Sequence, residues 1–177
     1  MLSALQFIAI FSTALFAGAA IYINLVEHPA RLSCSTEIAL AQWAPSYKRA
    51  TVMQASLAVI GALTGLGAWL LGAGTLWLMG AVCIFAVVPV TLIVIMPTNK
   101  QLLAPGRDPS SPETRSLLIR WGQLHAIRSA LSIAAVVVYL WQGCPSVIIP
   151  RRPERLRDLL ILHSRLQRHA FVELLDH

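Results

Sequence analysis

Charged residues are scarce in this chain, and acidic residues are the scarcest. Asp, Glu, Lys and Arg make up 12% of its 177 residues, and eight of these are Asp or Glu. A soluble domain has about 25% charged residues, so the composition argues against a soluble protein. Apolar residues reach 56%, and the mean hydropathy is +0.67. We therefore expect an integral membrane protein, and the length allows one domain in the membrane.

The sequence also lacks several motifs on which common enzyme classes depend. It has no glycine-rich phosphate loop, no nucleophile elbow and no zinc-binding spacing. Its three cysteines, Cys34, Cys83 and Cys144, are too widely spaced for a metal site, so we expect free thiols. We expect no metal and no cofactor. No basic segment precedes the first apolar run, so we expect that run to be a membrane helix and not a signal peptide.

The net charge of +6 raises the question of nucleic-acid binding. Six of the fourteen basic residues lie from Arg151 onward, and a basic tail suits the headgroups of a bilayer. We therefore expect a lipid bilayer and no nucleic acid as partner. The chain divides into a four-span transmembrane domain, 1–142, and a tail, 143–177. The tail is expected to be either a basic amphipathic helix on the membrane surface or disordered.

Four apolar segments approach the length of about 20 residues that a membrane-crossing helix needs. They run approximately from Leu2 to Val26, Ala55 to Leu71, Thr75 to Met96 and His125 to Trp141. The expected fold is all-α, a four-helix transmembrane bundle with a short interfacial helix between spans one and two. That helix should begin at Ser35-Thr36-Glu37. We expect this multi-pass protein in the inner membrane of the cell.

Smaller features predict how the spans pack. Gly61 and Gly65 form a GxxxG pair, which allows two helices to approach closely. Pro89 should kink the third span. Three tryptophans lie near the predicted span ends, where interface anchors are found, namely Trp69, Trp77 and Trp141.

Polar residues gather at one end of the predicted bundle, on the side of the two longer loops. Trp121, His125 and Arg128 share one helical face, and a charge at the depth of Arg128 needs a partner or water. Glu27 is its nearest plausible partner. We expect a pocket that binds a small molecule, with His125, Arg128 and His28 as catalytic candidates. The substrate-binding candidates are Asn24, Glu27, Trp43, Tyr47, Arg49, Asn99 and Trp121.

Four segments of the chain resemble motifs of one membrane family. They are Tyr22–Arg31, Trp43–Ala50 ending Tyr-Lys-Arg-Ala, Met96–Lys100 reading Met-Pro-Thr-Asn-Lys, and Trp121–Arg128. In this order they resemble the anthrone oxygenases. The resemblance implies a four-span bundle and an oxygenase that acts on an activated phenolic carbon without a metal or organic cofactor. His125 would then act as base, Arg128 or Arg49 would stabilise an oxyanion, and a flat substrate would stack on Trp43, Tyr47 and Trp121.

Three functions stay open at this point. The first is the cofactor-independent oxygenase of an aromatic, anthrone-like or quinol-like lipophile. The second is an accessory or structural subunit that binds a partner protein, a lipid or a copy of itself, which the GxxxG pair and the basic tail suggest. The third is a haem or metal protein in which His28 and His125 are ligands, although no third ligand has diagnostic spacing.

Overall fold

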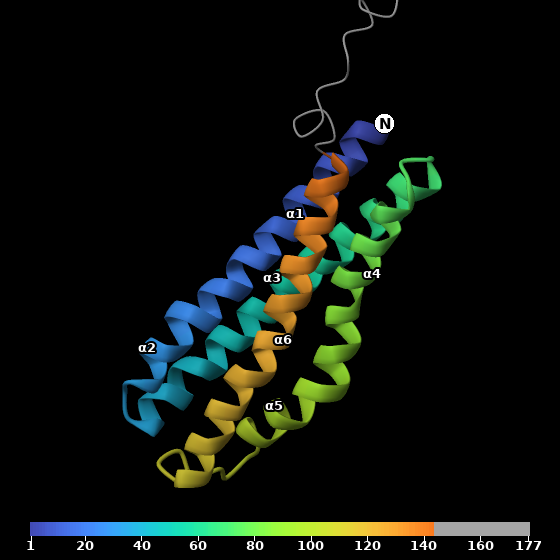
Figure 1. Ribbon diagram of the computed structural model, residues 1–177. Coiled ribbons are helices and arrows are strands. Elements are labelled where there is room, and N and C mark those ends of the chain that lie inside the picture. Colours follow the sequence, from blue (N-terminus) through green and yellow to red (C-terminus); the bar gives the residue numbers. More distant parts are fainter. Residues whose placement is uncertain (144–177) are drawn as a thin grey trace, which may run out of the picture. The chain divides into compact units, whose positions relative to one another are not determined.

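The computed structural model describes residues 1–143, which form helices joined by short loops and include no strand. Four long helical rods lie side by side, and each runs antiparallel to the one before it in the chain (Figure 1). Each is long and apolar enough to cross a membrane, and they span Leu2–Leu32, Thr36–Leu70, Thr75–Leu102 and Pro112–Gly143. The predicted four-helix transmembrane bundle is confirmed, and the protein is an integral membrane protein. The predicted conformation of the tail lies outside the described residues.

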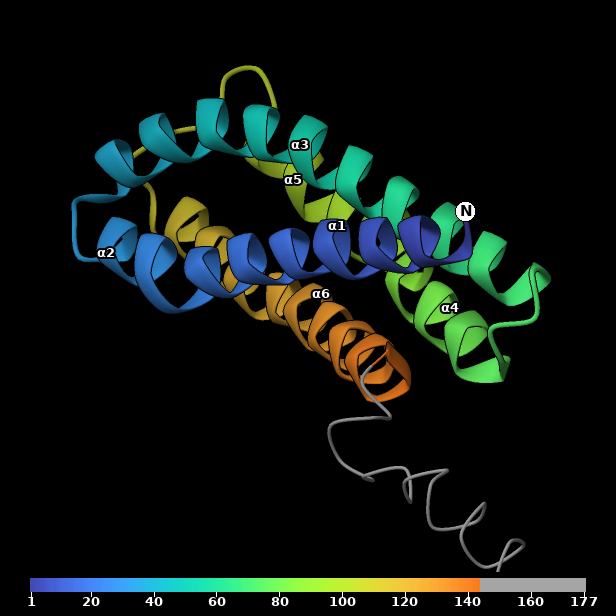
Figure 2. The same ribbon diagram turned by 90° about the horizontal axis from the view of Figure 1, so that it is seen from above.

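Two of the rods are built from several helical segments. The first consists of α1 (Leu2–Tyr22), the π-helical η1 (Ile23–Glu27) and α2 (His28–Leu32). The third consists of α4 (Thr75–Pro89), the π-helical η2 (Val90–Ile95) and α5 (Met96–Leu102). The second and fourth rods are the single helices α3 (Thr36–Leu70) and α6 (Pro112–Gly143). Figure 2 shows the loops before α3 and α6 at one end of the bundle and the α3–α4 turn at the other.

Prolines account for the two π-helical segments. Pro29 follows η1 and Pro97 follows η2 after one α-helical residue each. A proline has no N–H to donate, and its ring clashes with the carbonyl four residues earlier, so the preceding turn widens. Pro89 is the last residue of α4, and η2 begins at the next residue; the kink predicted at Pro89 stays a prediction. Single π-helical turns often lie at functional sites, and η1 carries Asn24 and Glu27.

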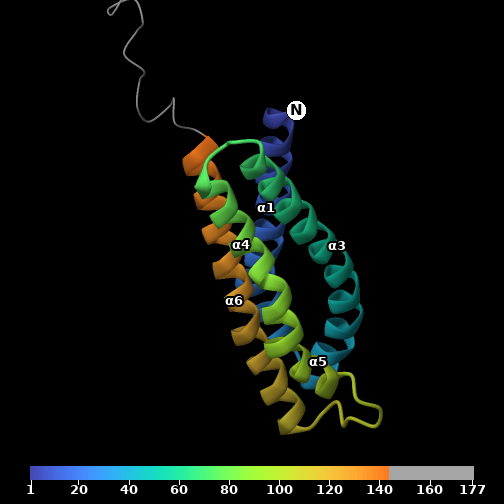
Figure 3. The ribbon, with the colours of Figure 1, turned by 90° about the vertical axis from the view of Figure 1, so that its right-hand side faces the viewer.

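The prediction of a separate, short interfacial helix between the first two spans was wrong. Ser35 caps a helix as predicted, because its hydroxyl oxygen accepts the Ile38 N–H at 3.4 Å. The helix then continues without a break into the second span, and α3 is 35 residues long. Pro45 removes one backbone hydrogen bond but does not end the helix, and α3 is visibly bowed (Figure 3). The other predicted spans also extend further into the loops.

The GxxxG pair packs inside the bundle. A Cβ atom at Gly61 would lie 2.5 Å from the Thr13 hydroxyl on α1, and one at Gly65 would lie 1.8 Å from the Tyr139 hydroxyl on α6. Tyr139 also donates to the Gly61 carbonyl at 3.1 Å. These glycines therefore serve contacts within one chain, which removes one reason for expecting a partner subunit.

Trp77 does not anchor the bundle at the interface. Its side chain is fully buried and stacks on Tyr139, with ring centroids 5.0 Å apart. The side chain turns inward because the neighbouring Gly80 leaves room for the Tyr139 ring. Trp141, in contrast, is exposed, as an interface anchor would be.

Candidate functional site

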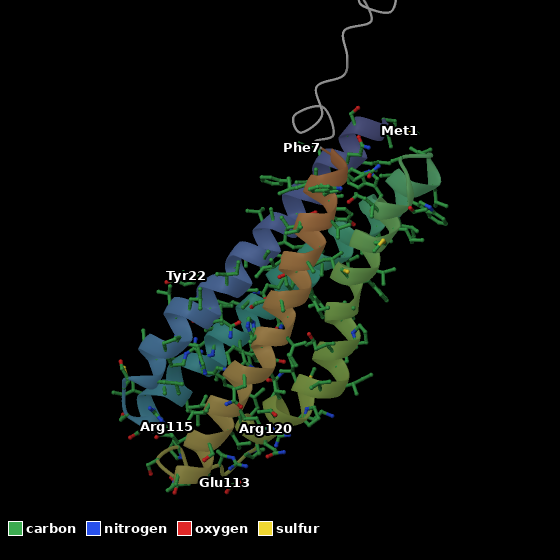
Figure 4. The ribbon with its side chains drawn as sticks, viewed as in Figure 1. Met1, Phe7, Tyr22, Glu113, Arg115 and Arg120 are labelled. Carbon is green, nitrogen blue, oxygen red and sulfur yellow. The ribbon has the colours of Figure 1, made fainter. Side chains whose placement is uncertain are left out.

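Polar side chains are concentrated at the end of the bundle that carries the loops before α3 and α6. Figure 4 shows nitrogen and oxygen atoms gathered toward Glu113, Arg115 and Arg120, whereas carbon predominates around Phe7. Several of these polar side chains are buried between the helices. They form two connected groups, one around His125 and one around Arg31.

The tautomer of His125 follows from its neighbours. The Asn24 side-chain N–H donates to the Gly122 carbonyl at 2.9 Å, which fixes the orientation of this amide. Its oxygen is then the acceptor for both His125 Nδ1 at 2.8 Å and the Ser129 hydroxyl at 2.6 Å. Nδ1 of His125 must therefore carry a proton. In the neutral ring, Nε2 is left with a lone pair, and it has no hydrogen-bond partner in the described part of the chain.

His28 has the opposite tautomer and no free nitrogen. Its Nε2 donates to the Leu118 carbonyl at 3.0 Å, and its Nδ1 accepts from Arg31 at 3.1 Å. Gly122 permits this placement, because a Cβ atom there would lie 2.5 Å from the imidazole. Both nitrogens are thus engaged, which argues against His28 as a metal or haem ligand. Within residues 1–143, no group of three or more His, Cys, Asp or Glu side chains could hold a metal ion.

Glu27 pairs with Arg31, so the expectation that it would pair with Arg128 was wrong. The two residues are four positions apart, which brings their side chains together on one helical face. The Glu27 carboxylate also accepts from Ser46 at 2.7 Å and from Gln42 at 3.2 Å. Gln42 in turn accepts a hydrogen bond from Arg31. This network ties η1 and α2 to the first turns of α3.

Arg128 is a buried cation without a carboxylate partner in the described chain. Its side chain is 7% exposed, it donates to Gln54 Oε1 at 2.7 Å, and it lies over the Phe16 ring at 5.4 Å. Its Nε has no acceptor, and neither does the amide nitrogen of Gln54. A buried guanidinium is costly unless it is paired or wetted. This group is therefore suited to an anionic oxygen.

A small chamber connects His125 with Arg128. It leaves ≈ 10 Å³ for the centre of a water-sized sphere, about enough for one water molecule. The indole N–H groups of Trp43 and Trp121 have no acceptor either. The chamber is thus rich in donors and poor in acceptors. Its lining residues are Ile23, Arg31, Trp43, Ser46, Tyr47, Ala50, Thr51, Gln54, Trp121, His125 and Arg128.

Aromatic rings form one wall of the chamber. Trp43 and Tyr47 are stacked with centroids 5.1 Å apart and planes at 6°, and Trp43 meets Trp121 edge to face at 5.8 Å. Trp121 in turn contacts the imidazoles of His28 and His125, at 5.1 and 4.9 Å. A flat ring stacked on Trp43 would have to displace Tyr47, which is only half-buried.

The structure brings most of the predicted site residues together and leaves two apart. Arg49 is exposed on the outer side of α3, in a shallow depression with Pro45 and Met53. Asn99 is buried on α5 with both polar side-chain atoms unpartnered, but it does not line the chamber. Their predicted roles in substrate binding stay predictions.

Sequence reasoning did not assign five polar residues of these networks to the site, namely Arg31, Gln42, Ser46, Gln54 and Ser129. Arg31 and Ser46 were placed in a loop, because the first and second spans were expected to be shorter. Ser129 and His125 are four residues apart on one helix, and this spacing is the signal that could have found Ser129.

The fold and the site together define a polytopic helical membrane protein with a buried, donor-rich chamber at one end. A family model described as anthrone oxygenase matches residues 43–138. This match covers more than half of the chain, and the protein belongs to the anthrone oxygenase family. The match includes Trp43, Tyr47, Trp121, His125 and Arg128, whereas Asn24 and His28 precede it. Neither the curated proteins nor the solved structures gave a match.

Proposed function

We propose that this protein is a membrane-embedded oxygenase of an acidic aromatic ketone or quinol-type lipophile, and that it uses O₂ without a cofactor. The observation that carries the proposal is the pairing of groups in one chamber. His125 Nε2 offers a lone pair beside donors that lack acceptors, Arg128 foremost. A molecule that gives up a proton and develops a negative oxygen complements both. Membership of the anthrone oxygenase family supports the same chemistry.

The reaction begins with proton transfer. His125 Nε2 removes a proton from a CH₂ group that lies between two aromatic rings and is conjugated to a ketone. The electron pair of the broken C–H bond moves to the ketone oxygen, which becomes an enolate. Arg128, with the free N–H of Gln54, donates hydrogen bonds to this oxyanion and stabilises it.

The electron-rich enolate then reduces O₂. A C–O bond forms at the deprotonated carbon, and the resulting peroxide takes the proton held by His125. Loss of water from the hydroperoxide leaves a carbonyl group. The CH₂ group and O₂ thus become C=O and H₂O, and no external electron donor is needed.

Other residues position the reacting groups. The Asn24 side-chain oxygen accepts the Nδ1–H of His125 and also the Ser129 hydroxyl, which keeps the His125 ring in its Nδ1–H tautomer. His28 is fixed by the Leu118 carbonyl and packs against the Trp121 ring. Glu27 binds Arg31, which lies near the Trp121 ring at 6.0 Å. A planar substrate can stack on Trp43 only where it displaces the half-buried Tyr47.

Oxygen consumption with anthrone as substrate tests the proposal. The protein in detergent is compared with His125→Gln and Arg128→Gln, after subtraction of the protein-free oxidation rate. We expect each substitution to lower turnover by about 100-fold or more. Arg120→Gln is the matched control, because Arg120 is exposed and lies outside the chamber. A folded His125→Gln protein with unchanged turnover would overturn the mechanism.

Two expectations about the surroundings stay predictions. They are the inner membrane as the location and an assembly with copies of the chain or with a partner subunit.

A further inference from the structure

An apolar groove lies next to the chamber. It has ≈ 130 Å³ for the centre of a water-sized sphere and runs between α3 and the third rod. Ala55 and Ala58 line it on α3, and Val87, Val88 and Leu92 line it on α4 and η2. Figure 3 shows α3 bowed away from the third rod along this part of the bundle. Leu92 and Ala55 are exposed, so the groove opens on the outer surface of two helical rods that are apolar enough to cross a membrane.

The inner end of the groove is polar. Tyr47, Thr51, Gln54 and Arg128 line both the groove and the chamber. Gln54 is 1% exposed and Arg128 is 7% exposed, and each has a nitrogen without an acceptor. A groove that served only to accommodate lipid tails would not need a buried cation at its end. The polar chamber and the apolar groove together therefore complement an amphiphile, a molecule with one polar end and one apolar chain.

The size of the chamber points the same way. A space for about one water molecule cannot hold a fused-ring compound, so most of a ligand bound at Arg128 must lie in the groove. An apolar chain placed there contacts side chains on both walls.

We propose that the groove binds the single alkyl or isoprenoid chain of an amphiphile dissolved in the bilayer. The oxygen-bearing ring of this amphiphile lies at the junction with the chamber, beside Arg128. The substrate thus enters sideways from the membrane between α3 and η2. The inference deepens the proposed function and rests on it for the identity of the ring, whereas the chain-binding groove stands on its own geometry.

A pair of quinone probes tests the groove without any turnover. One is 2-hydroxy-1,4-naphthoquinone, which carries an acidic oxygen, and the other is its 3-decyl derivative. Their affinities for the full-length protein in phosphatidylcholine nanodiscs are measured by calorimetry. Affinities are expressed relative to the concentration of each probe in the lipid, so that partition into the bilayer does not contribute to them. On this scale we expect the decyl probe to bind at least about tenfold more tightly, because its chain packs closely against both walls of the groove.

Ala55→Phe fills the groove and should reduce this preference to within about twofold. Ala130→Phe makes the same change at an exposed alanine of α6 outside the groove and should keep the preference. Partition of the probes into lipid is the same for every variant, so a change in the decyl preference between variants reports the groove alone. Val88→Phe on the opposite wall gives a second variant in case Ala55→Phe does not fold.

The outcomes separate the two proposals. The groove would be overturned as a chain site if the unmodified protein showed no preference for the decyl probe. It would also be overturned if Ala55→Phe kept the same preference as the unmodified protein. A normal preference in a protein that does not oxidise anthrone would leave the groove standing and would count against the oxygenase mechanism alone.

Discussion

The Asn24 amide decides which nitrogen of the His125 imidazole carries the proton. Its own orientation is set by the Gly122 carbonyl, and its oxygen accepts His125 Nδ1–H at 2.8 Å. The lone pair of the neutral ring therefore lies on Nε2. One residue on η1 thus sets the tautomer of another on α6, 101 positions later in the chain.

Substitution of Asn24 by leucine should release the tautomer of His125. Leucine offers no acceptor for Nδ1–H or for the Ser129 hydroxyl, so the Nε2–H form should become populated. Solid-state ¹⁵N NMR of histidine-labelled protein measures the tautomer, with His125→Gln to assign the signal. A His125 ring that is already in the Nε2–H form in the unmodified protein would contradict this account.

Replacement of Glu27 by alanine should destabilise the polar end of the bundle. It leaves the buried Arg31 without its carboxylate and Ser46 without its acceptor. We expect a loss of about 1–3 kcal/mol in the free energy of unfolding, seen as a lower melting temperature in detergent. Glu37→Ala is the control, because Glu37 is exposed in the first turn of α3. Equal melting temperatures for the two variants would show that the network contributes little.

Two glycine-to-alanine substitutions should differ in their effect on stability. A Cβ atom at Gly65 would collide with the Tyr139 hydroxyl, whereas one at Gly18 meets nothing within 4 Å. Gly65→Ala should cost about 1–3 kcal/mol through overpacking, and Gly18→Ala should be neutral or stabilising by up to about 1 kcal/mol. Thermal unfolding of both variants compares them. Tyr139→Leu, which removes the clashing ring, should make Gly65→Ala better tolerated, and a failure to do so would refute the packing argument.

The loop before α6 should lose stability in acid. The Ser110 N–H and hydroxyl donate to the Asp108 carboxylate at 2.9 and 2.8 Å, and they hold its pKa below the usual range. The ionised form is therefore stabilised in the folded state, and its contribution is present above the unfolded pKa, about 4. It is lost as the pH falls through the lower folded pKa. Asp108→Ala should lower the melting temperature at neutral pH and have less effect at about pH 3, whereas an equal effect at both would exclude this linkage.

The sequence by itself determined that the protein crosses a membrane, the number of spans and the end of the bundle at which the polar residues gather. Runs of apolar residues have one stable solution in lipid, because backbone polar groups must be satisfied within a helix. The start of the third span at Thr75 and the helix cap at Ser35 were also predictable, because each depends on residues close together in the sequence. The face shared by Trp121, His125 and Arg128 follows from helical periodicity alone.

Only the tertiary structure decided which of these polar residues meet. Glu27 pairs with Arg31 four residues away, and Arg128 turns to Gln54 on another helix. The tautomers of His28 and His125 depend on the Leu118 carbonyl and on Asn24, which are 90 and 101 positions distant. The physical reason is that hydropathy and periodicity are local, whereas hydrogen-bond partners depend on how helices rotate and bend against one another. Here that geometry is set by prolines after η1 and η2 and by glycines that admit the Tyr139 and His28 rings.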